Sequence, residues 1–260
     1  GLPDPARDVR LMLAHALGLA PDRLMIALHD PVTAEAEASF ATLIAARAEG
    51  RPVSQILGRR RFWGRSFRVT RDVLDPRPET ETLVAEALTQ PFTRLLDLGT
   101  GSGAIALSLL ADQPQAQGLA TDLSPAALDV ARSNAAILGL SDRLTFQLAN
   151  WFDGVEGVFD LIVSSPPYIS AAVMAGLDPG VLDWEPHLAL SPGGDGLDAY
   201  RAIAAGALAH LAPGGRILVE IGPNQGQAVA GLFVAAGLQD PRILPDFDRR
   251  DRVVLAHAPA

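Results

Sequence analysis

Two residue types are missing from this chain of 260 residues: it has no cysteine, and its 21 basic residues are all arginine. Without cysteine there are no disulfide bonds, thiolate zinc sites or cysteine nucleophiles, which fits a reducing compartment; we expect a cytoplasmic protein. Without lysine there is no Schiff-base chemistry and no phosphate loop of the kind that needs lysine. The five histidines show no metal-ligand spacing, so we expect no metal site.

Long hydrophobic runs are missing too. No apolar stretch reaches the length of a membrane helix, and we expect no charged and apolar leader at the start of the chain. The formal net charge of −9 argues against binding DNA through its phosphates, which requires a basic face. A local arginine cluster at Arg59-Arg60-Arg61, Arg65 and Arg68 either faces solvent or forms a small basic surface. We therefore expect a monomer with no membrane partner and no nucleic-acid partner.

Residues 1–50 have the periodicity of helices. The first helix is expected from Asp4-Pro5, an N-cap followed by proline, to Gly18. A second, short helix is expected from Pro21 to Leu28, and a third from Thr33 to Gly50. Residues 51–76 are predicted to be a connecting hairpin and linker, with two short strands about Gly64.

Residues 77–260 alternate strands with helices, a pattern that indicates a mostly parallel sheet covered on both faces. The expected strands are 94–98, 118–122, 144–149, 159–164, 215–221, 239–244 and 253–257. The expected helices are 79–88, 103–111, 125–138, 197–211 and 225–236. The stretch 169–196 has no clear periodicity, and we expect a functional or mobile loop there. The fold class is α/β: a Rossmann-like domain with a seven-stranded sheet, preceded by a small helical domain.

A glycine-rich turn follows the strand 94–98 and opens a helix. Its residues are Gly99, Thr100, Gly101, Ser102 and Gly103. Glycine lets the backbone turn tightly and approach a ligand closely, although nicotinamide-binding folds use a related loop with G-x-G-x-x-G spacing. Asp122 ends the next strand, where a carboxylate can accept ribose hydroxyl groups or can instead stabilise the N-terminus of the following helix. Trp151 either stacks on an adenine ring or packs against the core.

The run Ser165-Pro166-Pro167-Tyr168 follows the strand 159–164. Two prolines fix φ and remove two backbone donors, which leaves a rigid segment with exposed carbonyl groups. An amide nitrogen is a poor nucleophile, so an enzyme that methylates it has to hold its N–H groups with acceptors and orient the nitrogen. The Ser165 hydroxyl oxygen and the Pro166 carbonyl are the expected acceptors, and Tyr168 is expected to pack over the planar group. This pattern is typical of methyltransferases that use S-adenosylmethionine on a planar NH2 group.

Across nearly its whole length the sequence resembles the PrmC/HemK family, the release factor glutamine N5-methyltransferases. The matching segments are Arg7-Asp8, Leu13–Gly18, Gln55–Gly58, Phe62–Gly64, Val73–Glu81, Glu185-Pro186, Ala189-Leu190, Gly193–Leu197, Glu220–Gly222 and Asp251-Arg252. The run Arg77-Pro78-Glu79-Thr80-Glu81 is more specific to the family than any glycine-rich turn.

The resemblance implies a class I S-adenosylmethionine-dependent enzyme that methylates the glutamine of the Gly-Gly-Gln tip of class 1 peptide chain release factors. It places the cofactor on Gly99–Gly103, Asp122 and Trp151, with Ser165 beside it. It places the glutamine against residues 165–168, with Arg77 and Glu79 also on the substrate side. Residues 1–50 are implied to help dock the release factor.

One position departs from the family. Its tetrapeptide is Asn-Pro-Pro-Tyr, whereas this chain has Ser165 at the first position. Serine can accept a hydrogen bond, but from a shorter stem and without a carbonyl group. A tolerated variant with a bridging water, an inactivated site and a different acceptor are all compatible with serine. Ser-Pro-Pro-Tyr also resembles DNA cytosine-N4 methyltransferases, so the alternatives are a DNA aminomethyltransferase and a release-factor-binding module with impaired catalysis.

Overall fold

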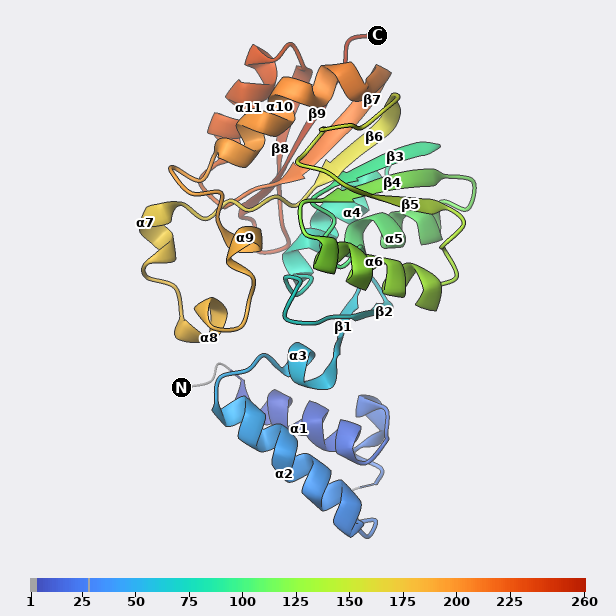
Figure 1. Cartoon of the computed structure of the whole chain (residues 1–260), viewed down its shortest axis with the longest axis vertical. Helices are drawn as coiled ribbons and strands as arrows, with labels where there is room; N and C mark the ends of the chain where they lie inside the picture. Colours follow the sequence, from blue (N-terminus) through green and yellow to red (C-terminus); the bar gives the residue numbers. More distant parts are fainter. Residues whose placement is uncertain (1–3, 28) are drawn as a thin grey trace. The chain divides into compact units, whose positions relative to one another are not determined.

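The computed structural model of this chain describes residues 4–27 and 29–260 (Figure 1). Its contacts define two units. The first consists of Gly1–Arg59 together with Asp178–Trp184, and the second of Arg60–Leu177 together with Glu185–Ala260. The sequence-based domain limits, 1–50, 51–76 and 77–260, remain a prediction about function.

The two longest helices of the first unit are α1 (Pro5–Ala16) and α2 (Ala34–Ala48). Helix α1 begins after Asp4, whose side chain accepts a hydrogen bond from the Arg7 amide at 3.1 Å. Helix α2 is capped in the same way by Thr33. A half-buried ion pair of 2.7 Å between Arg47 and Asp8 joins the two helices.

The predicted helix from Pro21 to Leu28 is wrong: a single 3-10 turn, η1 (Pro21–Arg23), is present, and turns follow it to Ala27. Leu28 itself lies outside the described residues. Nucleating a helix is costly, and among residues 21–27 only Leu24 is buried in return, while Met25 and Ile26 are exposed.

The first unit also contains two short helices that the sequence patterns did not indicate, α3 (Val53–Leu57) and α8 (Pro179–Leu182). The Gln55 side-chain amide donates to the Trp184 carbonyl at 2.8 Å, and the Arg51 guanidinium lies 5.7 Å from the centre of the Trp184 ring. These contacts attach the segment 178–184 to the helices of residues 1–59.

A seven-stranded sheet organises the second unit. Its strands are β3 (Arg94–Leu98), β4 (Gln117–Asp122), β5 (Leu144–Leu148), β6 (Phe159–Ser164), β7 (Leu211–Glu220), β8 (Gln239–Pro245) and β9 (Asp251–His257). Their order is β5-β4-β3-β6-β7-β9-β8, and every pair is parallel except the two that involve β9. The mostly parallel seven-stranded sheet predicted from the sequence is confirmed.

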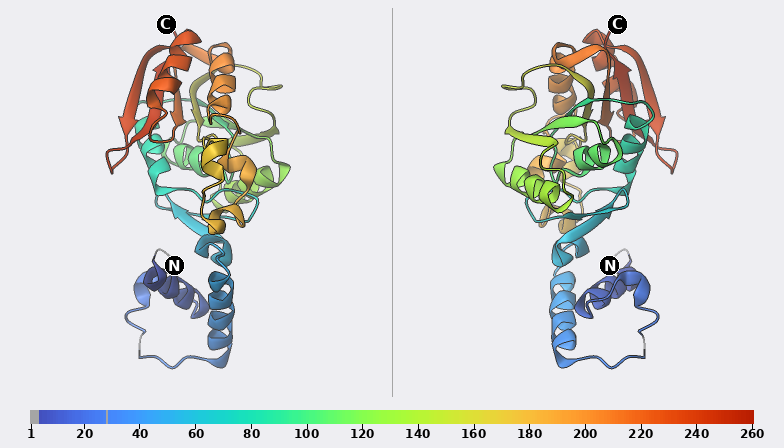
Figure 2. Two further views of the ribbon diagram at one scale, coloured as in Figure 1. Left: turned by 90° about the vertical axis from the view of Figure 1, so that its left-hand side faces the viewer. Right: turned by 90° about the vertical axis from the view of Figure 1, so that its right-hand side faces the viewer.

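Helices cover both faces of this sheet (Figure 1 and Figure 2). On one face lie α4 (Glu81–Ala87), α5 (Ala104–Asp112) and α6 (Pro125–Ile137), and on the other α10 (Asp198–His210) and α11 (Gly226–Ala235). Each face has its own apolar cluster, because the strands are buried on both sides and carry nearly continuous hydrophobic runs. Within the described residues, no helix is both long and apolar enough to cross a membrane.

Before the sheet, a hairpin of β1 (Arg59–Phe62) and β2 (Arg65–Arg68) turns at Trp63 and Gly64, both at positive φ. The 3-10 turn η2 (Pro78–Thr80) leads into α4. The stretch 169–196 is not an irregular loop throughout, since it holds α7 (Ala171–Met174), α8 and α9 (His187–Leu190). Each of these helices is only four residues long, too short to produce a periodic pattern.

Candidate active site

The carboxyl ends of three neighbouring parallel strands bring the predicted site residues to one edge of the sheet. Strand β3 lies between β4 and β6, and Leu98 pairs with Thr121 on one side and with Ser164 on the other. The glycine turn follows β3, Asp122 ends β4, and Ser165 follows β6. This edge is where open α/β sheets bind their ligands.

The glycine turn adopts backbone conformations that favour glycine, with φ of 68°, 55° and 79° at Gly99, Gly101 and Gly103. A Cβ atom on Gly101 would meet no heavy atom within 4 Å, so this residue borders open space. A Cβ atom on Gly103 would lie 3.0 Å from Leu107 and 3.2 Å from Ala131. Gly101 therefore leaves room for a ligand, whereas Gly103 lets helix α5 pack closely against α6.

Thr100 and Ser102 are both buried and brace the turn. The Thr100 hydroxyl donates to Asp97 Oδ2 at 2.6 Å, and the Ser102 carbonyl accepts from the Asn134 side chain at 2.8 Å. The Thr100 side chain and the Ser102 backbone carbonyl thus hold the turn in place for a ligand that contacts the glycines.

Asp122 holds the turn from the neighbouring strand. Its Oδ2 atom accepts from the Gly101 amide at 2.8 Å, and its Oδ1 atom accepts from the Ser124 amide at 2.9 Å. Burial raises the pKa of Asp122, although these backbone hydrogen bonds oppose the rise. A carboxylate has about four acceptor positions, so Asp122 keeps the capacity to accept two further donors.

Asp97 is a member of this site that sequence reasoning missed. It lies in β3 with none of its surface exposed, and within the described part of the chain its Oδ1 atom has no hydrogen-bond partner. Burial raises the pKa of Asp97 to about 7, against the hydrogen bonds from Thr100 and the Ala106 amide, and the charge of Asp122 adds to the rise. The signal available in the sequence was a single acidic residue within an otherwise apolar strand.

Trp151 lies next to the glycine turn. Its ring atom Cζ3 is 3.9 Å from the position that a Gly99 Cβ would take, and the side chain is half-buried. Its φ of 54° is rare for a large side chain, and such strain is concentrated at functional sites.

These residues fit S-adenosylmethionine. The unpartnered Asp97 Oδ1 suits a cationic ammonium group, and the free acceptor positions of Asp122 suit ribose hydroxyl groups. The open space at Gly101 and the ring of Trp151 suit the rest of a nucleoside.

The Ser165 hydroxyl donates to Glu220 Oε2 at 2.8 Å. The same oxygen accepts from Thr80 Oγ1 at 2.7 Å, and Arg252 Nη1 lies 4.0 Å from Glu220 Oε1. Thr80 belongs to η2, and Glu220 is the last residue of β7, the strand beside β6. The sequence indicated Glu220 only as part of the segment Glu220–Gly222, which matches the family. It did not predict the contact between Glu220 and Ser165.

Close packing fixes the Tyr168 end of this segment. Its carbonyl accepts from the Gln225 side-chain amide at 3.0 Å, and a Cβ on Gly222 would lie 3.4 Å from its ring. A Cβ on Gly196 would come within 2.5 Å of the Tyr168 carbonyl oxygen. Burial raises the pKa of Tyr168, so the phenol stays neutral near pH 7.

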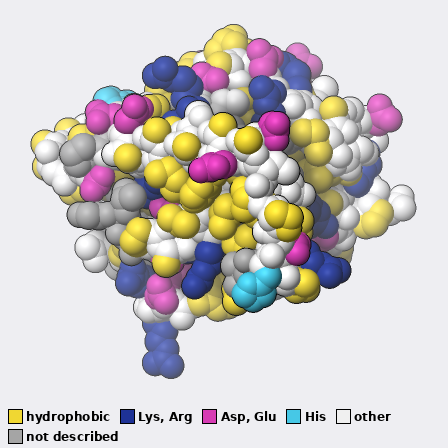
Figure 3. Space-filling model, turned by 90° about the horizontal axis from the view of Figure 1, so that it is seen from below, with side chains coloured by type: hydrophobic (Ala, Val, Ile, Leu, Met, Phe, Trp, Pro, Cys, Tyr) yellow, Lys and Arg dark blue, Asp and Glu magenta, His cyan; other side chains and the backbone are white. Residues whose placement is uncertain are grey.

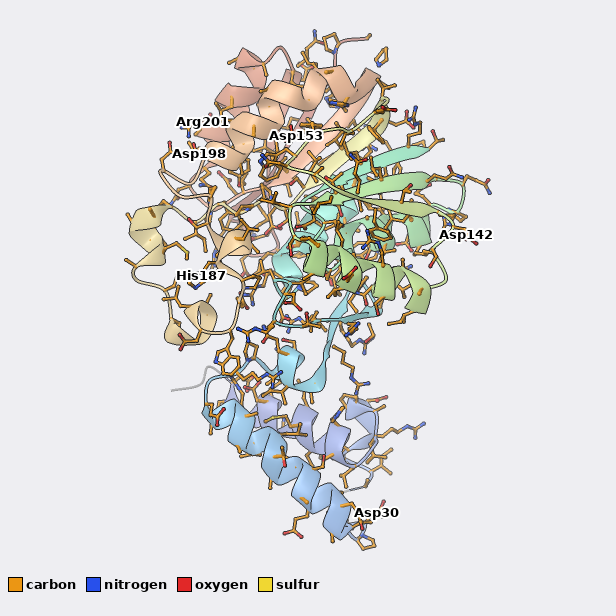
Figure 4. All side chains as sticks on the ribbon, in the orientation of Figure 1. Asp30, Asp142, Asp153, His187, Asp198 and Arg201 are labelled. Carbon is orange, nitrogen blue, oxygen red and sulfur yellow. The ribbon has the colours of Figure 1, made fainter. Side chains whose placement is uncertain are left out.

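The turn that contains Gly196 is held by exposed ion pairs. Arg201 contacts Asp195 and Asp198, each at 2.6 Å, and Figure 4 labels Asp198 and Arg201 at the start of α10. The hydrogen bond from Arg201 lowers the pKa of Asp195 to about 2.

Arg77 and Glu79 come from the segment around η2. One Arg77 nitrogen, Nη2, lies 2.6 Å and 2.7 Å from the two oxygens of Glu185, whose side chain is buried. Glu79 is half-buried. The charge of Arg77 lowers the pKa of Tyr168 and that of Glu79 raises it, both by less than burial does.

Comparison with known proteins gives two family matches. A profile described as the PrmC N-terminal domain matches residues 1–58, and one described as the methyltransferase small domain matches residues 71–176. A methyltransferase structure from Pyrococcus furiosus has a TM-score of 0.55 at 15% identity, covering 85% of this chain and all of that one. Together with the seven-stranded sheet, these matches place the chain among the Rossmann-like methyltransferases.

Curated relatives narrow this class. The release factor glutamine methyltransferase of Cereibacter sphaeroides is 61% identical over 260 residues, covering 100% of this chain and 94% of the relative. That of Rhodospirillum rubrum is 46% identical over 259 residues, covering 98% of this chain and 80% of the relative. The chain belongs to the family of release factor glutamine methyltransferases.

Proposed function

We propose that this enzyme transfers a methyl group from S-adenosylmethionine to the side-chain amide nitrogen of glutamine in the Gly-Gly-Gln motif of class 1 peptide chain release factors. The observation that carries the proposal is the Ser165–Tyr168 segment at the end of β6, next to the glycine turn after β3. This arrangement supports the proposal, since it would set amide acceptors beside the cofactor, and a 61% identical relative is named release factor glutamine methyltransferase.

When bound, S-adenosylmethionine would supply a methyl group on a cationic sulfur, and the neutral thioether would be the leaving group. Asp97 would accept from its ammonium group, and Asp122 would accept from its ribose hydroxyl groups. Trp151 would cover the adenine ring, and the backbone of Gly99–Gly103 would follow the remainder of the cofactor. These roles agree with the unpartnered Asp97 oxygen and with the space beside Gly101.

At the reaction site, Ser165 Oγ and the Pro166 carbonyl accept the two N–H groups of the substrate amide. This orients the nitrogen toward the methyl group and increases its electron density, so that orientation supplies most of the acceleration. The fixed φ of Pro166 and Pro167 keeps the acceptors in place, and Tyr168 packs over the amide plane. Arg77 and Glu79 lie on the substrate side, where Arg77 is held by Glu185.

The helical first unit contributes to docking of the release factor. In this unit Met25 and Ile26 are 68% and 73% exposed. Figure 3 shows that hydrophobic side chains also gather near the centre of one face of the molecule. Exposed apolar surface of this kind is typical of protein-binding sites. The cysteine-free composition and a release-factor substrate favour the cytoplasm as the place of reaction.

The test is incubation of the chain with cofactor and a class 1 release factor, followed by mass spectrometry of the tryptic peptide that contains Gly-Gly-Gln. We expect one added methyl group on glutamine. Methylation of a cytosine-containing DNA duplex instead would support the DNA aminomethyltransferase alternative. Release-factor binding without methylation of either substrate would identify a binding module.

A further inference from the structure

Glu220 is a buried carboxylate aimed at the side chain that faces the substrate. It is 2% exposed, and its Oε2 atom accepts the hydroxyl protons of both Ser165 and Thr80. A carboxylate is buried at a cost, and the nearest cation, Arg252, lies 4.0 Å from the other oxygen. If Glu220 only stabilised the fold, a neutral hydrogen-bond acceptor of the same shape would serve as well. The buried carboxylate therefore indicates a role beyond stability.

The hydrogen bond to Glu220 determines what Ser165 offers the substrate. The Ser165 proton is donated to Glu220, so the lone pairs of Oγ remain available to accept an amide N–H. A substrate N–H on Ser165 would complete a continuous chain of hydrogen bonds from nitrogen to Oγ to the carboxylate. Asparagine accepts through Oδ1 and donates through Nδ2, two different atoms, whereas serine accepts and donates through the same oxygen and so can pass a proton on.

We propose that Glu220 is the final acceptor of the proton that the methylated amide releases, and that Ser165 passes it on. This step rests on the proposed function. It explains how serine serves at a position where the family has asparagine.

The step balances as follows. The amide nitrogen forms a bond to the methyl carbon while the carbon–sulfur bond breaks, and the electron pair of that bond stays on sulfur. As positive charge develops on the nitrogen, one of its protons moves to Ser165 Oγ and the hydroxyl proton of Ser165 moves to Glu220 Oε2. The amide and Ser165 end neutral, and Glu220 ends as a carboxylic acid. Ser165 is half-buried, so after product release it can return the proton from Glu220 to water by the same path.

The environment of Glu220 suits this role. Burial raises the pKa of Glu220, while the hydrogen bonds from Thr80 and Ser165 and the charge of Arg252 limit the rise. A carboxylate with a raised pKa is a stronger proton acceptor than one in water. Removing the proton during transfer prevents positive charge from accumulating on the amide nitrogen.

The experiment is a double-mutant cycle measured as turnover of a release factor. Glu220→Gln keeps an oxygen that can accept from Ser165 but cannot take up a proton. We expect it to lower kcat on the order of 10²-fold, with KM for the release factor and the cofactor Kd unchanged. In a Ser165→Asn background, where no relay exists, the same change should alter kcat by no more than about twofold. Equal losses in the two backgrounds, or no loss in either, would overturn the relay.

Glu156→Gln is the matched control, because it makes the same change at an exposed carboxylate of the second unit that has no part in the proton path. It should leave kcat close to that of the unaltered chain. A loss of kcat as large as that of Glu220→Gln would show that the loss follows from removing any negative charge of the unit, and would overturn the proposal.

A second measurement does not depend on the folding of the Glu220 variant. Single-turnover methylation in D2O should be slower than in H2O for the unaltered chain, and the solvent should make no difference for Ser165→Asn. Equal solvent effects in both proteins would remove the relay while leaving the methyltransferase assignment intact. An unaltered chain that methylates no release factor would instead remove the proposed function, and this step with it.

Discussion

At the scale of single residues, the charge of Asp97 depends on what lies beside it. Its pKa in the folded chain is about 7, compared with 3.8 for an exposed aspartate. Below pH 3.8 the carboxyl is neutral in both the folded and the unfolded chain. Between pH 3.8 and 7 the unfolded chain loses this proton and the folded chain keeps it, so the free energy of unfolding falls as pH rises.

We therefore expect Asp97 to lower the stability of the cofactor-free protein by on the order of 4 kcal/mol between those pH limits. Urea unfolding at a series of pH values measures this, with Asp97→Asn as the comparison. The asparagine variant should have a flatter dependence on pH across this range. Parallel curves for the two proteins would show that Asp97 is ionised in the fold throughout.

Asp122 gives a second residue-scale prediction, because it braces the turn and is also expected to hold the ribose. Asp122→Ala should weaken cofactor binding by about 1–3 kcal/mol, the cost of leaving buried donors unpaired. Isothermal calorimetry measures the affinity. Asp142→Asn is the control, since it neutralises an exposed carboxylate (labelled in Figure 4) and should leave affinity unchanged. Unaltered affinity in Asp122→Ala would argue against the ribose role.

At the scale of elements, the segment Gly193–Gly196 supports Tyr168. Gly196 has φ of 82°, and its backbone approaches the Tyr168 carbonyl so closely that no Cβ fits. Gly196→Ala should destabilise the fold by about 1–3 kcal/mol and also lower turnover, because Tyr168 has to shift. Gly193 has nearly the same φ, 84°, but no heavy atom near its Cβ position. Gly193→Ala should therefore cost stability alone, by about 1–2 kcal/mol.

Urea unfolding and turnover on the release factor, measured on both variants, separate the two effects. A turnover loss in Gly193→Ala equal to that in Gly196→Ala would mean that backbone strain in the turn, and not contact with Tyr168, controls the site.

Secondary-structure elements could be predicted from the sequence where their side chains are completely buried. The runs Leu95–Leu98 and Leu161–Val163 are buried on both faces of the sheet, and such strands leave apolar patterns that are continuous except for Asp97. The glycine turn and the proline-rich segment were readable because each needs a backbone conformation that few residues can adopt. Helices of four or five residues, such as α3 and α9, have too few turns to show a period.

Contacts between distant segments were not readable in this way. Glu220 contacts Ser165 because β7 lies next to β6. The order of strands in a sheet cannot be predicted from the local periodicity of the sequence. Arg77 and Glu185 likewise pair across 108 positions of sequence. Local sequence patterns therefore identified candidate site residues, but not the contacts that hold them in place.

At the scale of the whole molecule, substrate docking and chemistry are assigned to different parts of the chain. If the helical unit docks the release factor, Met25→Ser with Ile26→Ser should raise KM for an intact release factor by about tenfold, as loss of an apolar contact patch does. Turnover of a short Gly-Gly-Gln peptide should be unchanged, since the site residues are intact. The control is Ile137→Ser, which removes a side chain that is 63% exposed in the second unit. Equal KM values for all three proteins would remove Met25 and Ile26 from the docking surface.

The helical unit is discontinuous, because it takes Asp178–Trp184 from the middle of the second unit's sequence. During synthesis the ribosome must therefore extend the chain to Trp184 before the first unit has all of its parts, although its helices emerge first. Until then the Gln55 side chain has no Trp184 carbonyl to bind, and the Arg51 guanidinium has no ring to cover. The part of the chain that is made earliest is therefore completed only after four strands of the sheet, β3 to β6, have been synthesised.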